Sequence, residues 1–334
     1  MKNRIALGLG AAVVACALTA SSAVAAGPPR PTAVNGNRVA VAGTGAGVPA
    51  QFAWAKNGDM FIAGASESAD VKGGIFVIKR GTKKVKRIAG SPKVAFGIAY
   101  SRGKIYASTG NRIVAYGGWD GKRFKHRRIV LKANQKRYTQ FNGVSIAPNG
   151  RIYTGVQFEF DATASKRKYA STVISVKKSG KDVKLIAKGI RNPWQLTFLD
   201  GEKQPIGTSL GSDTPEGTDA ADFVFKANPG SDFGFPVCEW GPSTMAGCTN
   251  FTKPLAIFPS KEPSTSPTGI THRGKKLFVA LFDPANSRVI SMNRKGQSQK
   301  EVLTGFAAPA VGVGVYKGHL YSSDTTGSIY KVKL

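Results

Sequence analysis

One motif recurs six times along the chain, and it limits the fold more strongly than any other feature. Each copy is an alternating apolar run, a turn centred on glycine, and a second run of apolar and aromatic residues. Alternation with period two around a short glycine-containing turn is typical of a β-hairpin. The copies start 44, 46, 52, 74 and 43 residues apart, and they occupy residues 52–64, 96–110, 142–155, 194–207, 268–281 and 311–324.

The spacing of the copies predicts an all-β fold, a six-bladed β-propeller. A four-stranded blade takes about 40–50 residues, so six copies indicate six blades, with a loop insertion around residues 207–260 in or after blade four. A second, more basic hairpin follows most copies and would form the half-solvated outer strands of each blade. We expect a single domain over residues 27–334, because the sequence shows no linker between domains. An eight-stranded barrel or a sandwich is the competing fold, but neither explains six equivalent copies.

The last blade lacks a fourth strand in its own stretch of sequence, which ends with residues 328–334. Residues 37–43 form an alternating run near the other end of the chain and are the candidate for the missing strand. Pairing of this N-terminal strand with the last blade would close the ring and protect both sheet edges.

The first 26 residues have the pattern of a signal peptide. Lys2 and Arg4 precede an apolar stretch over residues 5–20, and small residues follow at positions 23–25, where cleavage is expected. We therefore expect a secreted, extracellular protein without a transmembrane segment. The alternative is a lipoprotein, because residues 13–16 resemble a bacterial lipobox that would leave Cys16 as the lipidated N-terminus.

Two cysteines remain after signal removal, Cys238 and Cys248. In an oxidising compartment their close spacing predicts a disulfide that fixes one loop. A loop of this length contributes about 2–3 kcal/mol in the chain-entropy treatment.

The mature chain is strongly basic. Without Lys2 and Arg4, the 48 Lys and Arg become 46 against 19 Asp and Glu, a net charge of +27. Such a charge favours an anionic cell-surface polymer as partner. The cations are spread along the chain without interleaved aromatics, so specific nucleic-acid binding is not indicated. The alternative is a solvated basic face that only keeps the protein soluble.

Two segments resemble a known family. Residues 190–198 read IRNPWQLTF and residues 232–239 read DFGFPVCE. They are similar to the glucose/sorbosone dehydrogenase family, secreted six-bladed propellers that oxidise sugars with pyrroloquinoline quinone (PQQ). The resemblance is strong over residues 189–240 and weak but continuous over residues 52–334.

The resemblance implies positions for the cofactor and for calcium. It places Arg191 and Asn192 in contact with the quinone, with Gly211 and Ser212 as further cofactor-binding residues. It also places Gly211 and Ser212 in the segment that offers backbone carbonyls to the calcium ion, with Asp213 as a possible metal ligand; carbonyl and carboxylate oxygens are the ligands that calcium prefers.

Other positions depart from the family pattern. The histidine that acts as general base corresponds to Gln140, and an amide cannot accept a proton at neutral pH. Of the late cations that would hold the carboxylates of the quinone, only Arg288 is present, and residues 307–309 are Ala-Ala-Pro. Two hypotheses follow: a PQQ-dependent sugar dehydrogenase, or a catalytically silent propeller that binds a sugar, a polysaccharide or an anionic polymer.

The chain has three histidines and four tryptophans, and two of the tryptophans, Trp194 and Trp240, are candidates for the site. We expect His126 on an outer strand and His272 and His319 beside hairpin turns, all away from the mouth of the propeller. Trp194 is expected in the core, whereas Trp240 either lines the mouth or packs inside the inserted loop.

Overall fold

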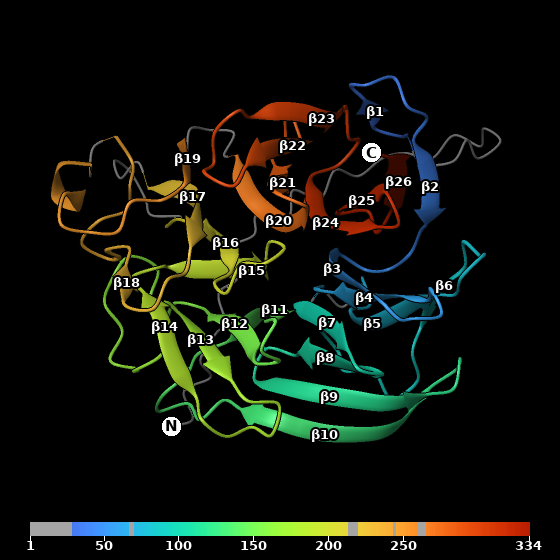
Figure 1. Cartoon of the computed structure of the whole chain (residues 1–334), viewed down its shortest axis with the longest axis horizontal. Helices are drawn as coiled ribbons and strands as arrows, with labels where there is room; N and C mark the ends of the chain where they lie inside the picture. The colour runs from blue at the N-terminus through green and yellow to red at the C-terminus, as the bar shows by residue number, and fades with distance from the viewer. Residues whose placement is uncertain (1–28, 67–69, 213–219, 243–244, 260–264) are drawn as a thin grey trace.

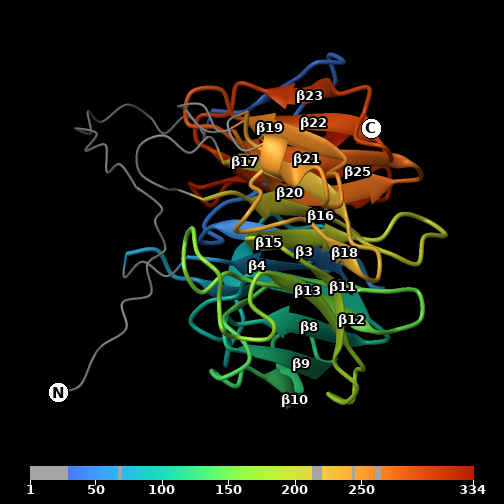
Figure 2. The ribbon, with the colours of Figure 1, turned by 90° about the vertical axis from the view of Figure 1, so that its left-hand side faces the viewer.

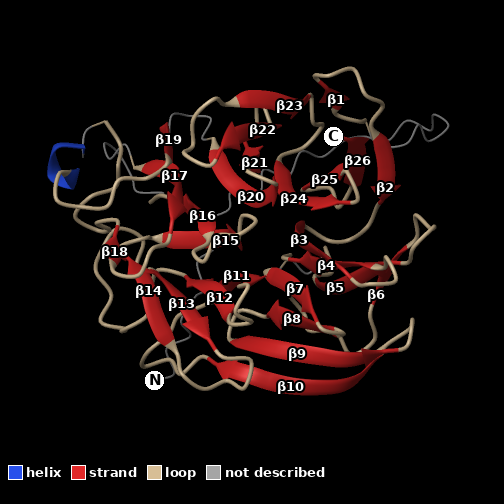
Figure 3. Ribbon diagram, viewed as in Figure 1, coloured by secondary structure: helices blue, strands red, loops and turns tan. Residues whose placement is uncertain are grey.

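The computed structural model describes residues 29–66, 70–212, 220–242, 245–259 and 265–334. The predicted signal peptide, Cys16 and Asp213 lie outside the described residues. The described residues form six mainly antiparallel sheets around one axis, as Figure 1 shows. The prediction of a six-bladed propeller is confirmed. Figure 3 shows strands in every blade, and the only helical element of the described chain is a short 3₁₀ turn, η1 (Met245–Cys248).

The strands of each blade follow one another from the axis outward in chain order, as Figure 2 shows for β8, β9 and β10. Blade one contains β3 (Pro49–Trp54), β4 (Met60–Gly64), β5 (Gly74–Ile78) and β6 (Val85–Arg87). Blade two contains β7 (Gly97–Ser101), β8 (Lys104–Ser108), β9 (Arg112–Trp119) and β10 (Phe124–Lys132). Blade three contains β11 (Phe141–Ile146), β12 (Ile152–Val156), β13 (Thr172–Val176) and β14 (Lys184–Lys188).

The second half of the ring repeats this order. Blade four contains β15 (Asn192–Thr197), β16 (Ile206–Leu210), β17 (Ala221–Lys226) and β19 (Ala256–Pro259). Blade five contains β20 (Ser266–Arg273), β21 (Lys276–Phe282), β22 (Arg288–Asn293) and β23 (Lys300–Thr304). Blade six contains β24 (Ala310–Tyr316), β25 (His319–Asp324) and β26 (Ile329–Lys333).

Three further strands join blades from elsewhere in the chain. β2 (Ala40–Gly43) pairs antiparallel with β26 and is the fourth strand of blade six. β1 (Thr32–Ala33) pairs with β23 at the edge of blade five. β18 (Ser231–Asp232) lies in the segment between β17 and β19 and pairs parallel with β14, so this segment leaves blade four, contacts blade three and returns.

The core lies between the blades. Buried apolar residues of the described chain form six clusters, one at each seam between neighbouring blades. Between blades one and two, for example, Phe61 and Ile75 pack with Ile98 and Ile105. β4 and β5 are buried along their whole length, because neighbouring blades cover both faces of these strands. A strand covered on both faces needs apolar residues at successive positions, and both strands are apolar throughout. We find no described helix that is long and apolar enough to cross a membrane.

Candidate functional site

The inner strands β3, β7, β11, β15, β20 and β24 surround the axis and contact one another in a closed ring. Because every blade repeats the same strand order, these strands begin at the same end of the axis. This end, where Gln140 precedes β11 and Arg191 precedes β15, is called the mouth below. The mouth is where the sequence placed its candidate site.

The inner strands approach one another closely just inside the mouth. Equivalent positions of the six inner strands hold two glutamines, in the opposite blades one and four, and four glycines: Gln51, Gly97, Gly143, Gln195, Gly269 and Gly312. A Cβ atom at Gly143 would lie 2.3 Å from Oε1 of Gln195, and one at Gly97 would lie 2.4 Å from the backbone nitrogen of Val144. Only glycine permits this close approach of neighbouring strands.

The two glutamines join blades across the axis. Oε1 of Gln51 accepts hydrogen bonds from the backbone nitrogens of Ile98, at 2.8 Å, and Val144, at 3.2 Å. Nε2 of Gln195 donates to the carbonyl oxygen of Phe96 at 3.0 Å. These neutral side chains form a floor beneath the mouth.

Three buried amides lie above this floor. Asn142, which is fully buried, donates from Nδ2 to Oδ1 of Asn192 at 2.7 Å and to the carbonyl of Pro193 at 3.0 Å. Nε2 of Gln140 lies 3.5 Å from Oδ1 of Asn142. The structure thus links Gln140 to Asn192 through Asn142, a residue to which the sequence analysis gave no role. None of the three amides can act as a general base.

Arg191 is buried, with only 4% of its side chain exposed, and its guanidinium is engaged by the protein. Nε donates to the carbonyl of Asp161 at 3.0 Å, and Nη2 forms an ion pair with the Asp161 carboxylate. Nη1 donates to the carbonyls of Leu210 and Gly211. The ring of Phe158 covers the group, with its centroid 4.0 Å from Cζ.

The segment at the end of β16 is held by two further acids. The backbone nitrogen of Gly211 donates to Asp222, and the Ser212 hydroxyl donates to Glu239. Burial raises the pKa of Glu239 above its ordinary value, although the Ser212 hydrogen bond and the Arg191 charge oppose the change. Arg191, Gly211 and Ser212 therefore lie together, and their polar groups form hydrogen bonds within the protein itself.

The described residues do not fit a quinone bound through calcium. The carbonyl of Gly211, which the resemblance assigns to the metal, accepts a hydrogen bond from Arg191. Arg288 is paired with Asp283 at 3.4 Å and donates to the carbonyl of Asn286 at 2.8 Å. The described residues contain no group of three side chains suited to a metal ion. The two cations that the resemblance offers to the quinone, Arg191 and Arg288, are thus both paired with acids of the protein.

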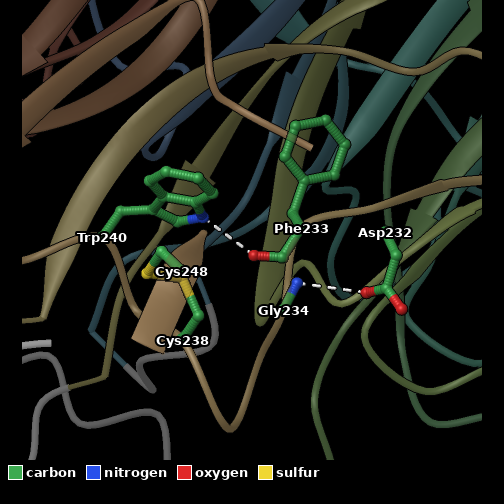
Figure 4. Close-up of a disulfide and its surroundings, with 6 residues drawn as sticks. All are labelled: Asp232, Phe233, Gly234, Cys238, Trp240 and Cys248. Atoms are coloured by element: carbon green, nitrogen blue, oxygen red, sulfur yellow. Dashed lines mark hydrogen bonds between the residues drawn. A yellow bond between two sulfur atoms is a disulfide. The ribbon is translucent and has the colours of Figure 1, made fainter. Parts of the chain in front are cut away.

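The inserted loop is fixed by the predicted disulfide, which Figure 4 shows. Cys238 and Cys248 are bonded and buried. Trp240 does not line the mouth: it is 4% exposed, it belongs to the core between blades three and four, and its Nε1 donates to the carbonyl of Phe233 at 2.8 Å.

The histidines lie where the sequence predicted. His126 is on the outer strand β10, and His319 begins β25 beside a hairpin turn. His272 contacts Thr197 at 2.9 Å near the ends of β20 and β15 that are distant from the mouth. None of them replaces the missing base.

Comparison with known proteins supports the fold. No family model and no curated protein matches the chain. Among solved structures, the PQQ domain of a pyranose dehydrogenase from Coprinopsis cinerea is 16% identical with a TM-score of 0.72, over 92% of this chain and 98% of that one. A carbohydrate-active enzyme of family AA12 from Trichoderma reesei is 16% identical with a TM-score of 0.74, over 94% and 100%. A putative oxidoreductase (glucose dehydrogenase) from Thermus thermophilus is 18% identical with a TM-score of 0.65, over 89% and 100%. The likeness that the sequence indicated is confirmed at the level of the fold.

Proposed function

We propose that this protein is an exported propeller of the sugar dehydrogenase type that binds a saccharide without oxidising it. One observation carries the proposal: Arg191, the most specific residue of the resemblance, is buried and paired with Asp161 and with the Gly211 carbonyl. A guanidinium held in this way has no pair of parallel N–H groups left to donate to a ligand carboxylate. The similar structures, among them a pyranose dehydrogenase domain and a putative glucose dehydrogenase, support a saccharide as the ligand.

The chemistry of the mouth agrees with this proposal. Removal of hydride from a sugar carbon requires a group that accepts the hydroxyl proton. Gln140 stands at the base position, and its neighbours Asn142 and Asn192 are amides as well. None of these three amides can take up a proton, which agrees with binding without oxidation.

Oxidation of an aldose with PQQ is the second candidate. It is favoured by the position of Arg191 and Asn192 at the mouth, which is the position that the resemblance assigns to quinone contacts. In this case the ion pair with Asp161 would have to open before the cofactor could bind.

Two measurements on the purified, oxidised protein separate the candidates. Calorimetric titration with a panel of aldoses and oligosaccharides, without cofactor, should detect binding of at least one member. After incubation with PQQ and calcium, a dye-linked assay with the same sugars should give no rate above that of free cofactor. Sugar-dependent dye reduction would refute the silent propeller. Gln140→His is the informative variant if the cofactor binds without turnover.

A further inference from the structure

A groove lies at the seam between blades six and one, near the labels β2 and β6 in Figure 1. Strands β2 and β26 form one side, and the β3–β4, β5–β6 and β24–β25 turns form the rest. Because β3 and β24 begin at the mouth and end at these turns, the groove opens at the opposite end of the inner strands. Its volume is about 560 Å³, within the range of small-molecule sites.

Three aromatic side chains form one wall of the groove. The ring of Tyr316 stacks on Trp54 with centroids 5.2 Å apart and an angle of 4°. Tyr321 packs against Trp54 at 5.2 Å in a tilted arrangement. The indole of Trp54 packs closely over Gly314, and a side chain at this position would clash with it, because a Cβ there would lie 2.7 Å from Cη2 of Trp54. All three rings are only partly buried, so their edges are accessible from the groove.

The rim of the groove is cationic. The charged residues that line it are Lys79, Arg80, Lys83, Lys317 and Lys331, and the described lining contains no Asp or Glu. The ammonium groups of Lys317 and Lys331 lie 5.5 and 5.7 Å from the ring centroids of Tyr316 and Tyr321. None of these five cations forms a salt bridge with another described residue.

A carboxylate close to the groove in sequence, Asp59, is already engaged. Asp59, beside the β3–β4 turn, accepts hydrogen bonds from Nε1 of Trp119 at 2.9 Å and from the backbone nitrogen of Arg80 at 3.0 Å. Its pKa is lowered: burial acts to raise it, but these hydrogen bonds and the Lys79 charge outweigh burial. Five cations gathered at one opening without a matching acid in its lining favour an anionic ligand.

We infer that this groove binds an acidic saccharide, a glycan segment that carries uronate carboxylates. The choice of a saccharide rests on the proposed function. The C–H groups of a sugar ring can pack against the exposed ring edges of the aromatic wall, and the carboxylates can pair with the ammonium groups of Lys317 and Lys331. A nucleic acid fits less well, because stacking of a base needs a free aromatic face and Trp54 is already stacked on Tyr316.

The test is a titration of the full mature protein with an oligogalacturonate, followed by tryptophan fluorescence. Lys317→Gln combined with Lys331→Gln should weaken binding about 3- to 20-fold, as expected for the loss of two solvent-accessible ion pairs. Lys295→Gln combined with Lys300→Gln removes the same charge from blade five and should change the affinity by less than about 2-fold. Trp54→Phe should abolish most of the fluorescence change while the protein stays folded by circular dichroism.

Three outcomes would overturn the inference. The first is a loss of affinity in the blade-five control as large as that in the Lys317 and Lys331 variant, which would indicate only the diffuse charge of the protein. The second is binding of the fully methyl-esterified oligosaccharide as tight as that of the acidic one. The third is Lys317-dependent binding of a single-stranded DNA of matched charge as tight as that of the oligogalacturonate. Dye reduction with PQQ would refute the proposed silent function instead, and it would leave these affinity ratios unchanged.

Discussion

Replacement of Arg191 by methionine tests the structural role that its contacts indicate. The variant leaves the carbonyls of Leu210 and Gly211 without their donor, and each buried polar group that loses its partner costs roughly 1–3 kcal/mol. The ion pair with Asp161 adds less than a buried pair would, because the Asp161 side chain is 40% exposed and can be rehydrated. We expect a loss of about 3 kcal/mol in the free energy of unfolding.

The assay is urea unfolding followed by fluorescence, with thermal unfolding as a second probe. A loss of this size lowers Tm by roughly 6–10 °C in a domain of a few hundred residues. Arg191→Lys keeps the charge but not the planar fork, so it should lose about half as much stability. Arg123→Met is the matched control, because Arg123 is exposed, and it should stay within about 0.5 kcal/mol. If Arg191→Met is as stable as the parent or more stable, the guanidinium is not a structural group and remains available for a ligand.

Three further changes test other parts of the structure. Gly155→Ala should prevent folding or cost several kcal/mol, because its Cβ would lie 1.9 Å from a backbone carbonyl oxygen of blade four, whereas Gly247→Ala, with its nearest neighbour at 3.6 Å, should be tolerated in the same expression and melting assay. Replacement of Cys238 and Cys248 together by serine should lower the free energy of unfolding by about 2–3 kcal/mol relative to the oxidised parent, and an unchanged urea midpoint would contradict this. Asp59 has a pKa below its ordinary value, so its contribution to stability is present above about pH 4 and is lost as the pH falls further; Asp59→Asn should therefore lower the urea midpoint at pH 7 and remove part of its decrease toward pH 3.

The sequence predicted the fold well because the hairpin repeat is a local signal. Alternation and glycine turns specify each inner strand pair, and seams between blades require apolar residues on both faces, as in β4 and β5. The parallel pairing of β18 with β14 was not predicted, because a two-residue strand in an inserted loop has no periodicity to detect.

The candidate site was predicted only in part. Arg191, Gly211 and Ser212 lie together, but the residues that engage them do not form a motif. Asp161 lies in the loop after β12, and Glu239 was quoted in the second segment of the resemblance without a role. Only the folded chain shows that Asp161 pairs with Arg191 and that Glu239 accepts a hydrogen bond from Ser212.

Other features depend on contacts between distant parts of the chain. Trp240 could not be placed from sequence, because an aromatic residue in a loop can line a mouth or pack beneath it. The groove between blades six and one could not be predicted from the sequence either, since it combines Trp54 of blade one with Tyr316 of blade six.

We infer that Asp161 and the Gly211 carbonyl hold Arg191 in place and that the mouth does not take up a quinone. Equilibrium dialysis of the purified protein against PQQ, with and without millimolar calcium, tests this inference. We predict no saturable binding up to about 100 µM cofactor in either condition, a free energy weaker than roughly −5.5 kcal/mol. Stoichiometric, calcium-dependent binding at micromolar PQQ would show instead that Arg191 is released to hold the cofactor.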